Sequence, residues 1–306
     1  MAACENISFR ITLSSAFRQG ATLTPRRFFL IENVAVGRLQ SRRDAPRVRG
    51  RVGNLDKHPL TTVQPPEGPV ERSYIRPIAL GESIAPYRTL SVSTGIIPIH
   101  DGVILNATTA EVAGLRGLSN WLRDAEQKWN QHSNKDADGN PNRSLTERID
   151  AMGTLRAQVS RYPIRVLYTK AGTRLSACWL EDEEIVVDHK AYWSAASSLN
   201  EAAYISAIVN SKLVLDRVKD LEPVGQRDRR DFDNLVWTLP IPEYDPHEVL
   251  HTDIAAAALH AAEIAAQVEL PEAAHFTTKR RLIRRALEAD GIAATIERLV
   301  DALLPL

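Results

Sequence analysis

Cysteine is scarce in this chain, and its placement excludes two kinds of structure. Cys4 and Cys178 lie far apart, and neither belongs to a Cys-x-x-Cys pair. Disulfide frameworks and thiolate metal sites both need grouped cysteines. The sequence therefore predicts a protein of a reducing compartment with no thiolate metal site.

Long apolar runs are also missing. The longest run, Ile254 to Val268, is interrupted by His260 and Glu263 and is shorter than the roughly 20 residues that span a bilayer. The first residues do not have the basic-then-apolar order of a secretory signal. Charged residues make up 25% and hydrophobic residues 44% of the chain, as in soluble globular proteins. We therefore expect a cytoplasmic protein that does not bind a membrane.

The chain has a formal net charge of +0, which by itself argues against a polyanionic partner. Its basic residues are nevertheless clustered in the sequence. The two clusters are Arg42, Arg43, Arg47, Arg49 and Arg51, and Lys279, Arg280, Arg281, Arg284 and Arg285. Such clusters are a weak footprint of nucleic-acid binding, and solvated faces of ordinary elements explain them equally well.

Residue periodicity predicts a mixed α/β (α+β) fold, with a β-rich body, packed helices and an α-helical C-terminal tail. The expected strands are Ile7 to Leu13, Arg27 to Val36, Thr89 to Ile99, Ile164 to Thr169, Leu175 to Leu180 and Glu184 to Asp188, with a hairpin across Lys170 to Thr173. Helices are expected over Ala110 to Gln131 and Leu145 to Ser160. From Pro246 the chain is alanine-rich, and breaks at Pro271 and Gly291 predict about three helices. We therefore divide the chain into a body, residues 1–245, and a helical tail, residues 246–306.

The most informative segment runs from Ala203 to Pro242. Its sequence predicts a helix that begins at Asn200, which suits the N-cap, then an arginine-rich loop, then a short strand that ends in Leu-Pro-Ile-Pro. This succession resembles the target-recognition region of adenine-specific DNA methyltransferases from restriction-modification and phage-defence systems. The matching residues are Ile208 to Ser211, Gly225-Gln226, Arg230 to Asp233 and Trp237 to Pro242.

Other segments match the same enzymes in the same order. They are Phe17 to Thr22 with Pro25 to Phe29, Arg76-Pro77 with Gly81 to Arg88, Tyr168 to Thr173, and Val187 to Trp193. Each match is weak alone, but several in one order are much more specific. The resemblance covers most of residues 17–245 and implies a region that binds double-stranded DNA and selects a sequence.

The motifs of the catalytic half of these enzymes are missing. Such enzymes hold the extruded adenine with an Asn/Asp-Pro-Pro-Tyr/Phe tetrapeptide, and Asn140-Pro141-Asn142-Arg143 is not one. No Gly-x-Gly turn suited to S-adenosylmethionine occurs in the chain either. We therefore expect a recognition module without a cofactor, which works beside a catalytic methyltransferase domain or subunit.

The resemblance and the basic residues together define a predicted DNA-binding set. Arginines of the loop can read guanine bidentately, although the family commonly has a lysine where this chain has Asn234. At the expected hairpin tip, Gly172 lets the backbone approach DNA while the flanking basic side chains contact phosphates. A self-neutralised surface loop and an ordinary exposed hairpin are the alternatives. The predicted DNA-binding residues are Arg26, Arg27, Arg49, Arg51, Lys170, Arg174, Lys190, Arg227, Arg229 and Arg230.

The segment His247-Glu248-Val249-Leu250-His251 is a literal His-Glu-x-x-His pattern. On a helix its two histidines would share a face and hold zinc, with the glutamate as general base of a hydrolase. However, Asp245 is a natural N-cap and Pro246 suits the first helical position, so helix capping explains the same residues. A zinc-dependent hydrolase is therefore the alternative function.

The segment Asp188-His189-Lys190 follows an expected strand and resembles the second half of a PD-(D/E)xK nuclease site. In such a site the carboxylates hold magnesium and the lysine polarises the attacking water. No Pro-Asp stands at a suitable distance upstream. A strand-end turn whose lysine meets phosphate is the preferred interpretation.

Overall fold

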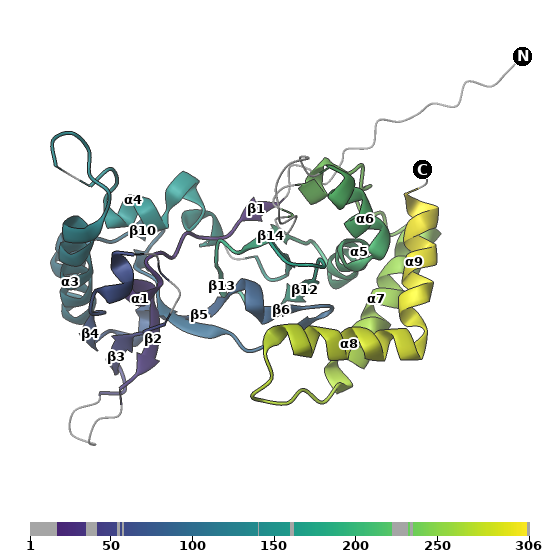
Figure 1. Ribbon diagram of the computed structural model, residues 1–306, viewed down its shortest axis with the longest axis horizontal. Coiled ribbons are helices and arrows are strands. Elements are labelled where there is room, and N and C mark those ends of the chain that lie inside the picture. Colours follow the sequence, from purple (N-terminus) through teal and green to yellow (C-terminus); the bar gives the residue numbers. More distant parts are fainter. Residues whose placement is uncertain are drawn as a thin grey trace, which may run out of the picture.

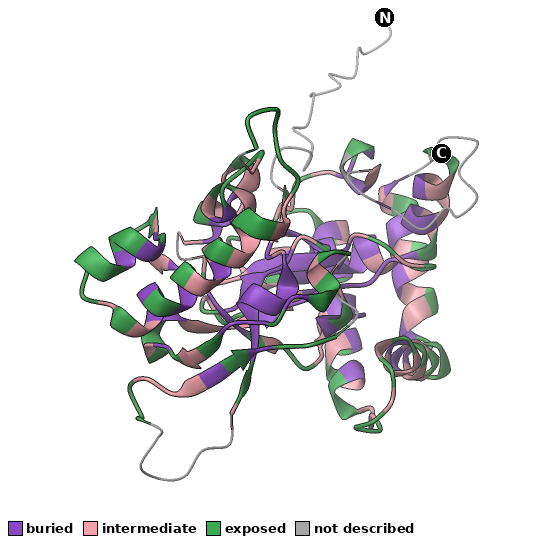
Figure 2. Cartoon of the chain, turned by 60° about the vertical axis from the view of Figure 1, so that its left-hand side comes forward, coloured by how far each residue is buried: buried purple, intermediate pink, exposed green. Residues whose placement is uncertain are grey.

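The computed structural model describes residues 17–34, 42–53, 56, 58–139, 141–159, 162–221, 232 and 235–304. These residues form an elongated molecule whose two halves meet at a narrower middle (Figure 1). One half is built on a six-stranded sheet, and the other combines a four-stranded sheet with the C-terminal helices. Figure 2 shows buried residues concentrated in the sheets and on the helix faces turned toward them.

The first half contains a mixed sheet with the strand order β13-β5-β8-β2-β3-β4. Its pairs are antiparallel except β13 with β5, which is parallel. Leu118, Trp121 and Leu122 are buried on one face of helix α3, and the Trp121 indole donates to the Phe28 carbonyl at 2.9 Å. The elements of this half are α1 (Arg26–Phe29), β2 (Leu30–Asn33), β3 (Arg47–Gly50), β4 (Glu67–Pro69), β5 (Ile75–Ala79), β8 (Ser93–Ile96), β9 (Ile99–His100), β10 (Val103–Ile104), α2 (Ala107–Val112), α3 (Arg116–His132), α4 (Leu145–Ile149) and β13 (Val186–Val187).

The second half contains an antiparallel sheet with the order β1-β14-β11-β12. Helix α5 packs on it, and all eight residues from Ala202 to Val209 are buried. The helix begins because the Ser198 side chain accepts a hydrogen bond from the Glu201 backbone N–H at 3.1 Å, as an N-cap does. The elements are β1 (Arg18–Gln19), β6 (Ile84–Ala85), β7 (Arg88–Thr89), β11 (Arg165–Thr169), β12 (Ala177–Leu180), β14 (Ala191–Ala195), α5 (Leu199–Asn210) and α6 (Lys212–Leu221).

Three C-terminal helices complete the second half: α7 (Val249–Gln267), α8 (Phe276–Asp290) and α9 (Ile292–Leu303). Their apolar residues share one core with α5, β11 and β12. Gly291 has a φ of 94° and lies between α8 and α9, because glycine adopts the left-handed region at little cost. Hydrogen bonds from two arginines connect helices α7 and α8 to strands β6 and β7. Arg88 donates to the Ala265 and Val268 carbonyls at 2.8 Å, and Arg280 donates to the Ile84 carbonyl at 2.7 Å.

The two halves are joined where the chain passes from β13 to β14. Asp188, on this connection, is fully buried and forms an ion pair with Arg26 at 2.8 Å. Its other oxygen lies 3.0 Å from the His189 Nδ1 atom. A Cβ atom on Gly20 would lie 2.3 Å from the Asp188 carbonyl oxygen, so the chain segments approach closely here. This connection fixes one half against the other.

The mixed α/β fold with a helical C-terminal tail is confirmed, as are the hairpin of β11 with β12 and the tail helices broken near Pro271 and at Gly291. The expected helix over Ala110 to Gln131 is divided into α2 and α3 because Gly114 has a φ of 76°. The expected helix over Leu145 to Ser160 ends at Ile149, since Met152 and Gly153 both have positive φ.

Other local predictions were wrong. Arg27 belongs to the short helix α1, so the following strand is shorter than expected. The segment Leu235–Thr238 is a 3-10 helix where a strand was expected, and Pro240 and Pro242 cannot donate to a ladder. The cap of α5 is Ser198 and not Asn200. The expected strand Ile7 to Leu13 lies outside the described residues. Among the helices described, none combines the length and apolar character needed to cross a bilayer.

Candidate nucleic-acid interface

The tip of the β11–β12 hairpin brings together three segments that are distant in the sequence. The Lys170 backbone N–H donates to the Lys190 carbonyl at 3.1 Å, at the end of β11 beside the start of β14. The Phe232 backbone N–H donates to the Lys170 carbonyl at 2.9 Å. Two predicted DNA-binding lysines and the end of the arginine-rich segment therefore meet at one place.

Phe232 anchors that segment against the hairpin tip. Its side chain is fully buried, and it lies about 4.0 Å from the position that a Cβ atom on Gly172 would occupy. Gly172 has a φ of 152°, so a larger residue would be strained here. Arg227, Arg229 and Arg230, the loop arginines of the predicted set, lie outside the described residues. The described residues on either side of them, α6 and Phe232, belong to the second half of the molecule.

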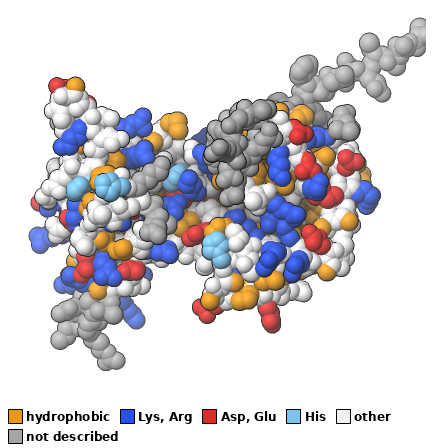
Figure 3. Space-filling view, viewed as in Figure 1, with side chains coloured by type: hydrophobic (Ala, Val, Ile, Leu, Met, Phe, Trp, Pro, Cys, Tyr) orange, Lys and Arg blue, Asp and Glu red, His pale blue; other side chains and the backbone are white. Residues whose placement is uncertain are grey.

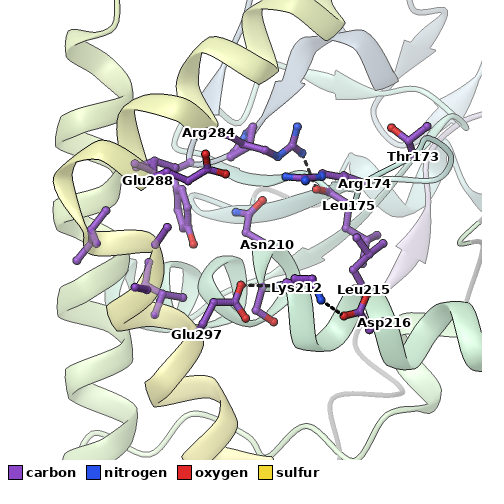
Figure 4. A pocket seen from close by; sticks show the side chains of 18 of the residues that line it. Thr173, Arg174, Leu175, Asn210, Lys212, Leu215, Asp216, Arg284, Glu288 and Glu297 are labelled. Atoms are coloured by element: carbon purple, nitrogen blue, oxygen red, sulfur yellow. Dashed lines mark hydrogen bonds and ion pairs between the residues drawn. The ribbon is translucent and has the colours of Figure 1, made fainter.

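Helix α8 lies beside the hairpin tip and adds a basic side chain to it. Arg284 donates to the Leu175 carbonyl at 2.9 Å and to the Ser176 hydroxyl at 2.7 Å (Figure 4). Burial lowers the pKa of Arg284 to about 10, with further contributions from the like charges of Arg174 and Arg280. The guanidinium groups of Arg174 and Arg284 are therefore neighbours, although no sequence spacing indicated that they would be.

The solvent-facing side of α8 carries further basic residues. Arg281 and Arg285 are exposed, stand one helical turn apart, and form no ion pair within the part of the chain that the structure describes. Like charges at this spacing destabilise a helix by roughly 0.2–0.5 kcal/mol. Figure 3 shows Lys and Arg side chains gathered over α8 and the adjoining surface of the second half. We call Lys170, Arg174, Lys190, Arg281, Arg284 and Arg285 the basic face.

Arg26 and Arg27, also in the predicted set, are buried. Arg26 pairs with Asp188, and Arg27 pairs with Asp56 at 3.1 Å and also donates to the Val63 carbonyl. Arg26 is 9% exposed and Arg27 is 3% exposed, so neither guanidinium can contact a phosphate in this conformation. Both residues hold the N-terminal segment in place.

Arg49 and Arg51 lie on and directly after β3, in the first half, and are not part of the basic face. Arg49 pairs with Glu32 at 2.6 Å across β2 and β3, and Arg51 donates to the Ser93 hydroxyl at 3.4 Å. Both side chains are exposed. Exposed polar contacts of this kind contribute little to stability, so a ligand can replace Glu32 or Ser93 as the partner of these arginines.

Two properties of the C-terminal basic cluster do not follow from its sequence. Arg280 belongs to it in sequence but is buried and binds backbone carbonyls, so it stabilises the packing of α8. Arg284 lies next to the hairpin tip, where it donates to Leu175 and Ser176, and only the packing of α8 reveals this contact. The only indication in the sequence that these residues have a function was the clustering of basic residues.

The His-Glu-x-x-His pattern does not form a metal site. Helix α7 begins at Val249, so His247 precedes the helix and is exposed. His251 is buried, its Nδ1 accepts from the Asp245 backbone N–H at 2.9 Å, and its ring lies 4.8 Å from that of Tyr204. Across the described residues no group of three His, Cys, Asp or Glu side chains could hold a metal ion. The zinc-hydrolase alternative therefore has no support.

The Asp-His-Lys segment has a structural role. Both oxygens of the buried Asp188 have partners, namely Arg26, His189 and the Lys190 backbone N–H. A magnesium ion would have to displace Arg26 to reach this carboxylate. The geometry agrees with the preferred interpretation, in which a strand-end turn presents the exposed Lys190.

Comparison with known proteins gives a fold relationship only. Neither a known protein family nor a curated protein sequence matches the chain. The structure is similar to that of the Type IIL restriction-modification enzyme MmeI in complex with DNA, with a TM-score of 0.55 and 12% sequence identity over 99% of this chain and 34% of that one. The type IIG restriction endonuclease BpuSI aligns with a TM-score of 0.35 and 13% identity over 96% of this chain and 32% of that one, which is too low to support an argument. The chain therefore has the fold of about a third of a restriction-modification enzyme.

Proposed function

We propose that this chain is a DNA-recognition module of an adenine-specific methyltransferase or another restriction-modification system, that it acts in the cytoplasm, and that it does not itself transfer a methyl group. Residues 1–245 are the recognition body, and residues 246–306 are the helical tail that supports it. The likeness to a DNA-bound restriction-modification enzyme favours this proposal. So does the resemblance of residues 17–245 to target-recognition regions.

One observation carries the proposal: basic residues that are distant in sequence meet at the hairpin tip. Lys170, directly after β11, bonds to the backbone of Lys190, directly before β14, and Arg284 of α8 lies beside Arg174 of the hairpin loop. Arg281 and Arg285 lie on the exposed side of the same helix. Several other exposed basic residues are neutralised by acids, as in the Arg47–Glu67 and Arg123–Glu111 pairs, but Arg281 and Arg285 have no such partner among the described residues. A cluster of basic side chains that includes residues without acidic partners, such as Arg281 and Arg285, is the electrostatic pattern expected of a site for a polyanion.

We assign the contacts with DNA to two classes, phosphate contacts and base contacts. Side chains of the basic face position the module on phosphates, which requires no base sequence. Sequence is read by Arg227, Arg229 and Arg230, since arginine recognises guanine bidentately in the major groove. Arg49 and Arg51 extend the phosphate contacts onto the first half. Arg26 and Arg27 are outside this division, because both are buried in ion pairs.

A catalytic partner completes the proposed function. The chain lacks the tetrapeptide that holds an extruded adenine and the glycine-rich turn for S-adenosylmethionine. It also spans only 34% of the length of MmeI. A methyltransferase domain or subunit would therefore supply the chemistry while this module selects the site.

Fluorescence anisotropy with random duplex DNA tests the proposal. We expect a dissociation constant of roughly 10⁻⁴ to 10⁻⁶ M at physiological salt, with affinity falling steeply as salt rises. Replacing both Lys170 and Arg174 by Ala should reduce the slope of log affinity against log salt by about two, since each lost phosphate contact removes about one unit.

Arg116→Ala is the matched control. Arg116 is exposed at the start of α3, in the first half, and is not part of the basic face. It should leave the salt slope unchanged. Binding that does not depend on salt, or an equal effect of the control, would refute the proposal.

A further inference from the structure

A cavity of about 370 Å³ lies beside the hairpin tip, between α6, α8 and α9 (Figure 4). Its volume falls within the range of roughly 300–1,000 Å³ that is typical of small-molecule sites. Part of its lining is apolar and consists of Leu215 from α6, Leu287 from α8, and Ile292 and Ile296 from α9. An organic group can therefore be buried against this apolar lining.

The charged residues of the cavity leave an excess of positive charge. Four basic residues line it against three acidic ones: Arg174, Lys212, Lys219 and Arg284, and Asp216, Glu288 and Glu297. Lys212 is paired with Asp216 at 2.5 Å, and Glu297 accepts from the backbone N–H groups of Lys212 and Leu213 at 2.5 and 3.3 Å. Glu288 lies near Arg284, and the formal charge of the lining residues is +1.

Arg174 and Arg284 form the basic corner of the cavity. Arg284 is held in place by its hydrogen bonds to the Leu175 carbonyl and the Ser176 hydroxyl. Figure 4 shows Arg174 next to it. The charge of Glu288 offsets only part of the repulsion between two neighbouring guanidinium groups, and their planar forks suit the oxygens of a phosphate.

Tyr87 contributes an unusual backbone conformation to the cavity lining. Its φ of 58° lies in the left-handed region, which bulky residues rarely adopt. Asn210 lines the same pocket, and its amide is fixed by the Ala177 backbone N–H and carbonyl, both at 2.9 Å. Strained residues concentrate at ligand sites.

We propose that this cavity binds a nucleotide, with its phosphate on Arg174 and Arg284 and its base against Tyr87 and the apolar lining. The guanidinium groups favour an anion, and the apolar lining favours an organic group that inorganic phosphate lacks. The nucleotide is either free in solution or part of DNA bound on the adjacent basic face, and this second source rests on the proposed function.

Calorimetric titration of the full chain with deoxyadenosine monophosphate tests the site directly. We expect the monophosphate to bind at least about tenfold more tightly than deoxyadenosine or inorganic phosphate, because only it uses both parts of the cavity. Ala293→Phe fills the cavity without changing charge, and Arg174→Gln removes one guanidinium. Each should weaken binding of the monophosphate at least about tenfold.

Ala289→Phe is the matched control, because Ala289 is exposed on α8 and does not line the cavity. It should bind the monophosphate as the unaltered chain does. Circular dichroism of each variant checks that a loss of binding is not a loss of fold.

DNA binding by Ala293→Phe separates the two sources. Weaker DNA binding identifies a nucleotide of DNA as the occupant, whereas unchanged DNA binding with loss of the monophosphate identifies a free nucleotide. If the monophosphate does not bind and Ala293→Phe leaves DNA binding unchanged, the cavity proposal is wrong while the proposed function stands. If the unaltered chain binds no DNA, the proposed function fails, and the monophosphate titration still decides the cavity.

Discussion

At the scale of single residues, burial separates arginines that hold the fold from arginines that are free to bind a ligand. Arg88, Arg165 and Arg280 all donate to backbone carbonyls, and burial lowers the pKa of Arg165 and of Arg280 to about 10. Both remain charged at neutral pH. Arg281, next to Arg280 in sequence, is exposed. Adjacent basic residues therefore have opposite roles according to the helix face they occupy.

The buried Arg26–Asp188 pair gives a prediction about stability. Replacing Arg26 by Ala leaves the fully buried Asp188 without its ion-pair partner, which should lower the free energy of unfolding by about 3–5 kcal/mol. Urea denaturation measures this change. Arg26→Met combined with Asp188→Asn should recover part of the loss, because no unpaired charge is left. Arg47→Ala, which breaks an exposed pair with Glu67, should cost less than about 1 kcal/mol.

The opposite outcome for Arg26 would restore the interpretation made from sequence. An Arg26→Ala variant that is as stable as the unaltered chain but binds DNA more weakly would identify Arg26 as a phosphate contact.

At the scale of elements, α8 has two different faces. Arg280, Ile283 and Leu287 are buried against the rest of the second half, while Arg281 and Arg285 face solvent. Replacing Arg281 and Arg285 by Ala should lower the salt slope of DNA binding by about two units. The same change should leave the melting temperature unchanged or slightly higher, because the repulsion between like charges one turn apart is removed. Anisotropy and thermal unfolding of the same variant measure both effects, and a large fall in melting temperature with no change in slope would contradict a role in DNA binding.

At the scale of the whole molecule, the C-terminal helices complete the core of the second half. Ile254, Ile283, Leu287, Ile296 and Val300 are all buried in the cluster that includes α5. Each such side chain contributes roughly 1.5–3 kcal/mol, so together they are comparable to the total stability of about 5–15 kcal/mol of a typical protein. A chain truncated after residue 245 should therefore fail to unfold cooperatively in a thermal melt followed by circular dichroism. A cooperative transition near that of the full chain would instead show that the tail is an independent unit.

The sequence by itself determined the features that depend on local patterns. Two β-rich runs on either side of the turn Lys170 to Thr173 predicted the hairpin, and Pro271 and Gly291 predicted where the last helices break. These features follow from backbone preferences and short-range periodicity, which a linear sequence contains. The order of the segments also led to restriction-modification systems, and the fold of MmeI agrees with that relationship.

Only the tertiary structure decided which basic residues are accessible and which lie together. Arg26 and Arg27 look like surface residues in the sequence, but long-range pairs with Asp188 and Asp56 bury them. Arg174 and Arg284 become neighbours only because α8 packs beside the hairpin tip. Burial and proximity between residues distant in sequence are properties of packing, and local periodicity contains no information about them.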